Sequence, residues 1–163
     1  MARWSANIPT WTPVAVADTT NFTDAGHMSV QGGSSTQRIN VLEAYMGGQA
    51  GASTPSIMLL ARHSTVGVTL SVGRFAALDP ASAALSAPPV VFNTSTTKPQ
   101  RSSTLSLLNL SFNAFGGIVR WVYAQGEEVG MLGNTASLGE LSLSAFTGGT
   151  PGLMGSHLIL EPF

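Results

Sequence analysis

The chain has 163 residues, a formal net charge of -1, no cysteine and only 9% charged residues. This length fits one domain with a substantial core, and the lack of cysteine excludes disulfide bonds and thiolate chemistry. The seven basic residues are scattered along the chain, so no clustered positive surface is available for a nucleic acid backbone. A monomer with so little charge lacks colloidal repulsion, and we expect its surface to be buried in an assembly.

The N-terminal segment, residues 1–13, contains Trp4, Pro9, Trp11 and Pro13. This composition predicts an extended arm, because proline favours extended backbone and tryptophan needs another surface to cover it. That surface is either this chain's own sheet or a neighbouring subunit. The segment has no apolar stretch of signal-peptide length, and no later run reaches 18 apolar residues, so we expect synthesis in the cytoplasm and no membrane span.

Residues 14–163 are predicted to form a single β-sandwich domain. Short runs rich in Val, Ile, Leu and aromatic residues recur roughly every 8 to 14 residues, which is the spacing of an all-β sandwich or barrel. The runs cover residues 29–32, 39–46, 56–64, 67–75, 88–93, 103–115, 117–124, 127–132, 138–146 and 157–163. Only residues 79–87 favour a short helix, since Pro80 follows a possible cap at Asp79.

Alternation is clear in the run at residues 139–146. Leu141 and Leu143 alternate with Ser142 and Ser144, which predicts one face toward a core and one toward a polar surface. The polar stretch at residues 93–103, which holds the only lysine, is predicted to be a projecting loop.

Two otherwise apolar runs each contain one charge, Glu43 in the first and Arg62 in the second. If these runs pair as a hairpin across the Gly-rich residues 47–56, the two charges face each other, which predicts a structural Glu43–Arg62 ion pair. A catalytic carboxylate is the alternative. Glycoside hydrolysis needs a second carboxylate across a sugar-sized gap, and nothing marks as that partner any of the acids that lie near predicted turns, Asp18, Asp24, Asp79, Glu127 and Glu128.

The other chemical motifs are weak. His27, His63 and His157 lack the spacing of a metal-binding pair, and the chain has neither a Gly-x-Ser-x-Gly nucleophile motif nor a phosphate-binding loop. We therefore expect no catalytic residue, no metal and no cofactor. Arg120 and Trp121 leave open a carbohydrate-stacking site, because an arginine beside an exposed aromatic residue suits sugar binding.

The order of several short sequence segments along the chain resembles that in a known class of proteins. LEAYMGG at residues 42–48, LARHS at 60–64, RWVYAQGEE at 120–128 and the terminal LILEPF at 158–163 follow a Pro-rich start. This order resembles small jelly-roll-like decoration proteins, also called auxiliary or cement proteins, of tailed bacteriophage capsids.

The resemblance implies a jelly-roll-like antiparallel β-sandwich with an extended N-terminal arm. It also implies a non-enzymatic virion protein that binds the major capsid protein lattice, often as a homotrimer, and decorates or stabilises the capsid surface. Such proteins have no fixed capsid-contact motif, so our interface hypothesis rests on Trp4, Pro9, Trp11 and Pro13. A carbohydrate- or receptor-binding module of a fibre or tail, and another structural component of the head or tail, remain alternatives.

Overall fold

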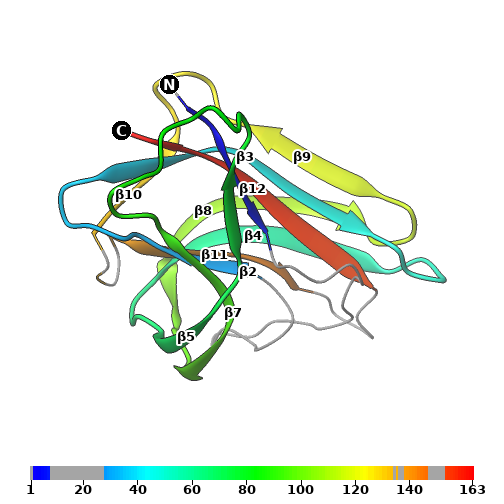
Figure 1. Cartoon of the computed structure of the whole chain (residues 1–163). Coiled ribbons are helices and arrows are strands. Elements are labelled where there is room, and N and C mark those ends of the chain that lie inside the picture. The colour runs from blue at the N-terminus through cyan, green and yellow to red at the C-terminus, as the bar shows by residue number, and fades with distance from the viewer. Residues whose placement is uncertain (1, 8–27, 134, 136–137, 147–152) are drawn as a thin grey trace.

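The computed structural model describes residues 2–7, 28–133, 135, 138–146 and 153–163, and these form two antiparallel sheets (Figure 1). The first sheet contains β1 (Trp4–Asn7), β3 (Arg38–Gly48), β6 (Arg74–Ala77), β9 (Ile118–Val122), β10 (Val129–Leu132) and β12 (Met154–Pro162). The second sheet contains β2 (Met28–Gln31), β4 (Pro55–His63), β5 (Val68–Val72), β7 (Val90–Thr97), β8 (Arg101–Asn113) and β11 (Glu140–Phe146). The predicted all-β, antiparallel sandwich is confirmed.

The chain wraps so that early strands pair with late ones. In the first sheet the order is β6-β1-β12-β3, and β9 and β10 pair with successive segments of the remaining edge of β3. The second sheet has the order β5-β7-β2-β11-β4-β8. Because β3 pairs with β12 and β4 with β11, the consecutive strands β3 and β4 lie in opposite sheets of the sandwich. Within the described residues, no helix has the length and apolar character needed to cross a membrane.

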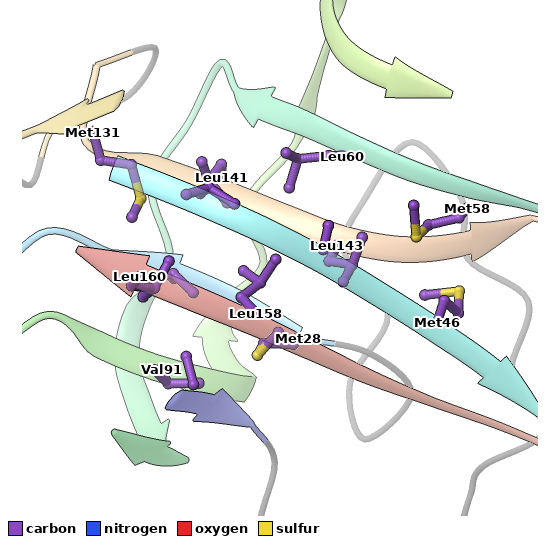
Figure 2. Packing of buried hydrophobic residues seen from close by; sticks show 14 of the residues in the cluster. Met28, Met46, Met58, Leu60, Val91, Met131, Leu141, Leu143, Leu158 and Leu160 are labelled. Carbon is purple, nitrogen blue, oxygen red and sulfur yellow. The ribbon is translucent and has the colours of Figure 1, made fainter. Parts of the chain in front are cut away.

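The core fills the space between the two sheets. Leu158 and Leu160 of β12 point toward Leu141 and Leu143 of β11 (Figure 2), and all four side chains are fully buried. Burying a leucine side chain stabilises the fold by about 1.5–3 kcal/mol. Five methionines complete the packing, since their flexible side chains fill irregular gaps; they are Met28, Met46, Met58, Met131 and Met154.

The start of the predicted arm is a strand of the sandwich. Residues 4–7 form β1, which pairs with β12 on one side and β6 on the other. Trp4 is 7% exposed and stacks on Phe75 with ring centroids 4.8 Å apart. For Trp4, the surface that covers the indole is therefore this chain's own sheet.

Three local predictions differ from the structure. Residues 79–87 form turns and bends instead of a helix, because too few residues lie between Asp79 and Pro88 to sustain helical packing. The run at 67–75 divides at Gly73 into β5 and β6, which lie in different sheets. The predicted loop at 93–103 is reduced to residues 98–100, since β7 and β8 extend into it.

A tight corner fixes where β9 begins. The Gly48 N–H donates to the Gly117 carbonyl at 2.9 Å, and the Ala50 N–H donates to the Ala114 carbonyl at 2.9 Å. A side chain at Gly48 would overlap the backbone of Ala114, so only glycine permits this close approach. The corner carries the chain from β8, at the edge of the second sheet, to β9 beside β3 (Figure 1).

Candidate functional site

Four polar side chains gather on the outer face of the first sheet: Glu43 and Tyr45 from β3, Arg120 from β9, and His157 from β12. Arg120 donates to Glu43 Oε2 through Nε at 2.9 Å and Nη2 at 2.6 Å, and the Tyr45 hydroxyl donates to the same oxygen. The Arg120 guanidinium lies 5.3 Å from the Tyr45 ring centroid. His157 meets that ring edge-on at 5.7 Å. We call these four residues the exposed ion cluster.

Proton affinities in the exposed ion cluster suit a structural role. The hydrogen bond from Tyr45 lowers the pKa of Glu43, Arg120 lowers it further, and desolvation only partly opposes them. The same hydrogen bond raises the pKa of Tyr45. At neutral pH the carboxyl is ionised and the phenol protonated, so neither is tuned for general acid or base catalysis. Burial lowers the pKa of His157, and the Glu43 charge opposes that shift.

The predicted Glu43–Arg62 pair is wrong. β3 and β4 are consecutive, but they lie in different sheets and do not form a hairpin. Glu43 pairs with Arg120 instead. Arg62 donates to the carbonyl oxygens of Gly130 at 2.6 Å and Leu138 at 3.3 Å, and burial lowers its pKa, helped by the charge of Arg38. Arg62 therefore links the end of β4 to β10 and to the residue Leu138 just before β11.

A second polar group lies on the face of the second sheet that is turned away from the core. Glu140 of β11 accepts a hydrogen bond from Gln31 Nε2 at 2.8 Å and one from the Gly67 N–H at 3.1 Å. Its other oxygen lies 2.5 Å from His63 Nδ1. Glu140 and His63 are both fully buried. We call Glu140, His63, Gln31 and Gly67 the covered polar cluster.

Further polar groups continue along the same covered face. Arg101 is 6% exposed, bonds to the Ser144 hydroxyl and lies over the Phe146 ring at 5.4 Å. Ser142 is fully buried, and its hydroxyl has no hydrogen-bond partner among the described residues. The predicted polar face of β11 is therefore buried as completely as its core face.

The covered polar cluster contains a histidine beside a carboxylate, but burial limits its chemistry. A general acid or base must reach the proton that it transfers, directly or through one water molecule. Neither Glu140 nor His63 exposes surface, so the arrangement ties segments together and offers no substrate contact. Buried charges are tolerated only when paired and hydrogen-bonded, and Glu140 meets this condition with three partner residues.

Sequence reasoning missed the covered polar cluster and the partner of Glu43. His63 was treated as isolated because its partner Glu140 lies 77 positions away along the chain. A sequence signal existed for the other pair: β9 is an apolar run with one arginine, just as β3 is an apolar run with one glutamate. Opposite single charges in two apolar strands favour their pairing wherever the strands lie in the chain.

The remaining residues of the interface hypothesis, and one of the histidines, cannot be placed. Pro9, Trp11 and Pro13 lie outside the described residues, as does His27. The described part of the chain contains no group of three histidine or acidic side chains placed to hold a metal ion.

Arg120 and Trp121 do not form a joint sugar platform. Adjacent strand residues point to opposite faces, and Arg120 is held by Glu43. Trp121 is 41% exposed and lies edge-on to Tyr123 at 6.3 Å. Burial raises the pKa of Tyr123 to about 12.

One shallow pocket lies where the chain end meets the β9–β10 connection. It has a volume of about 270 Å³ and is lined by Arg38, Asn40, Gly126, Glu128 and Phe163. Pockets for small-molecule ligands are commonly about 300–1,000 Å³ and enclose most of the ligand. This pocket is too small and open to identify a ligand class.

Large apolar side chains are instead exposed on several sides of the molecule. β9 exposes Ile118 at 73% and Val122 at 52%. Leu78 follows β6 at the opposite edge of the same sheet, and Leu138 precedes β11 in the other sheet; they are 53% and 60% exposed. Exposed apolar side chains that gather on one element mark a candidate interaction site, and β9 carries three, Ile118, Trp121 and Val122.

Comparison of the chain with protein-family models, curated protein sequences and solved structures gave no match.

Proposed function

We propose that the chain is a non-enzymatic structural virion protein that decorates the outer surface of a tailed-phage capsid. The observation that carries this proposal is the placement of exposed apolar side chains at opposite edges of the sandwich, on β9 and after β6. A protein fitted between neighbours in a lattice needs contact surfaces on more than one side. Repetition of modest contacts over a symmetric shell then gives strong overall binding.

The distribution of charge supports the same function. The chain has a net charge of -1 with few charged residues, so its surface is suited to burial against protein. Its buried acidic and basic groups form hydrogen bonds within the chain, as in the covered polar cluster. The major capsid protein lattice is the proposed partner, and the resemblance to decoration proteins favours a trimer on that lattice.

The test is sedimentation of the purified protein with capsids assembled without it. We expect co-sedimentation that saturates at a fixed ratio to the shell subunit, and protection of the shell against heat or dilution. Capsids of an unrelated phage serve as the control for non-specific adhesion. Protein that stays in the supernatant at micromolar concentration, or pellets equally with both capsids, would contradict the proposal.

A second candidate is a carbohydrate-binding module of a fibre or tail. It is favoured by one observation, the 41% exposure of Trp121 next to the ring of Tyr123, since exposed aromatic rings stack on sugars. A glycan array distinguishes it: binding that is lost in Trp121→Ala but kept in Phe115→Ala would move this function ahead. Phe115 is also exposed, at 59%, and serves as the matched control.

A further inference from the structure

The outer edge of β9 is an unpaired strand edge with no obvious protection. Among the described residues, β9 pairs only with β3 (Figure 1). Soluble proteins blunt such edges with lysine, proline, bulges or inward charges, because an exposed edge templates pairing with another chain. By contrast β8, the edge strand of the second sheet, has exposed polar residues such as Asn109 and Ser111. β9 exposes the apolar side chains of Ile118, Trp121 and Val122, and its one charged residue, Arg120, is paired with Glu43.

Two hydrogen bonds determine which backbone groups face outward. The Tyr123 N–H donates to the Leu42 carbonyl, and the Gly48 N–H donates to the Gly117 carbonyl, both at 2.9 Å. In an antiparallel ladder, alternate residues bond to the same neighbour, and the β3–β9 register has no bulge. The N–H and C=O groups of Ile118, Arg120 and Val122 therefore point toward the free edge.

We propose that β9 pairs with β9 of a second copy in antiparallel fashion, with Arg120 on the two-fold axis, so that the first sheet continues across the dimer. In this register Ile118 faces Val122 of the second copy, and each outward-facing residue exchanges two hydrogen bonds with its partner. On the other face, Val119 lies opposite Trp121. Pairs of aromatic and β-branched residues stabilise antiparallel strands.

The charges at the seam are compatible with this register. The two Arg120 side chains meet at the axis, where like charges destabilise a strand pair. Each guanidinium is already bound by Glu43 of its own chain, at 2.6 Å for its closest contact. The dimer seam therefore brings together two neutral ion pairs flanked by apolar pairs, and no charge is left without a counter-charge.

The pairing goes beyond the proposed function and does not depend on capsid binding. An isologous contact of this kind closes at two copies, whereas the resemblance to decoration proteins implies three. Sedimentation velocity of the free protein distinguishes the dimer from a monomer of 16.8 kDa and from a trimer. A concentration-dependent dimer is expected; a trimer without a dimer, or a monomer up to millimolar concentration, would overturn the inference.

A charge on the edge should weaken the dimer without unfolding the chain. Ile118→Lys changes a side chain that is 73% exposed, and we expect the dissociation constant to rise at least about tenfold. Leu78→Lys, at the opposite edge of the sheet and 53% exposed, introduces the same charge. It should leave dimerisation unchanged, and an equal loss in both variants would argue against the β9 contact.

The natural lack of cysteine permits a test of the register. In the proposed pairing, positions 118 and 122 of different copies have Cα atoms about 5.5 Å apart, within the range for a disulfide bond. Within one chain they are roughly 13 Å apart along the strand and cannot bridge. The double variant Ile118→Cys, Val122→Cys should therefore give a covalent dimer on oxidation with diamide.

Each single-cysteine variant is the matched control, because position 118 does not face 118 of the second copy, nor 122 face 122. Singles should stay monomeric on a non-reducing gel. Cross-linking of the singles as readily as the double variant, or none of the double variant, would exclude this register.

Discussion

Glu140 and Glu43 are both carboxylates on a sheet face turned away from the core, and both have a basic partner, yet their partners differ in exposure to solvent. Glu140 is fully buried and holds His63, Gln31 and the Gly67 backbone. Glu43 is bound by Arg120, whose side chain is 55% exposed. Burial makes the first group a determinant of stability, whereas the second neutralises a strand edge that is open to a partner.

The largest effect is expected from removing the Glu140 carboxylate. Glu140→Ala removes the acceptor shared by the buried His63 ring, the buried Gly67 N–H and the half-buried Gln31 amide, and breaking a buried pair from one side costs about 3–5 kcal/mol. Glu140→Gln keeps the volume and separates loss of charge from loss of packing. Urea denaturation measures both, with Glu127→Ala as an exposed control. A loss below about 1 kcal/mol for Glu140→Ala would show that the covered polar cluster does not stabilise the fold.

A smaller effect, of opposite sign, is expected at Ser142 in the same covered face. Its buried hydroxyl has no partner among the described residues, and an unsatisfied buried polar group costs about 1–3 kcal/mol. Ser142→Ala removes that cost but leaves a small void, so we expect a gain of up to about 1 kcal/mol in the free energy of unfolding. Ser144→Ala is the matched control, since Ser144 bonds to Arg101 and its loss should destabilise the chain.

The smallest effect is expected from the exposed ion cluster, and it depends on pH. Tyr45 and Arg120 hold the folded-state pKa of Glu43 below its ordinary value of 4.5. Its stabilising contribution is therefore present above pH 4.5 and is lost as pH falls through the lowered pKa. Solvent screening limits it to within about 1 kcal/mol.

Glu43→Gln should thus be slightly less stable than the natural chain at pH 7, and the difference should shrink at pH 3.5 and in high salt. Urea unfolding midpoints at the two pH values measure this. A difference that grows on acidification would contradict the assigned sign.

Local patterns in the sequence predicted the strands but not their partners. The run at 39–46 became β3 and the run at 56–64 became β4, with shifts of only a few residues at each end. The hairpin expected between them did not form, because each strand pairs with a strand far along the chain. Pairing depends on tertiary packing that no local pattern encodes. The same limit explains why Arg120, rather than Arg62, is the partner of Glu43.

The sequence also did not indicate which side chains outside the core are buried. The alternation of leucine and serine in β11 predicted a polar face correctly, but that face is covered. The connection from β4 to β5 brings the Gly67 N–H onto Glu140, and this approach depends on a chain path that composition does not reveal. Trp4 shows the converse: it was expected in an arm, and it lies in the core.

Amide hydrogen exchange at single-residue resolution tests most directly the central claim that the covered face stabilises the fold while the β9 edge serves association. The natural chain and Ile118→Lys would be compared at low and high concentration. We predict that the Gly67 amide is protected in every sample, whereas the Arg120 amide gains protection only in the natural chain at high concentration. Equal protection of Arg120 in all four samples, or rapid exchange of Gly67, would contradict the claim.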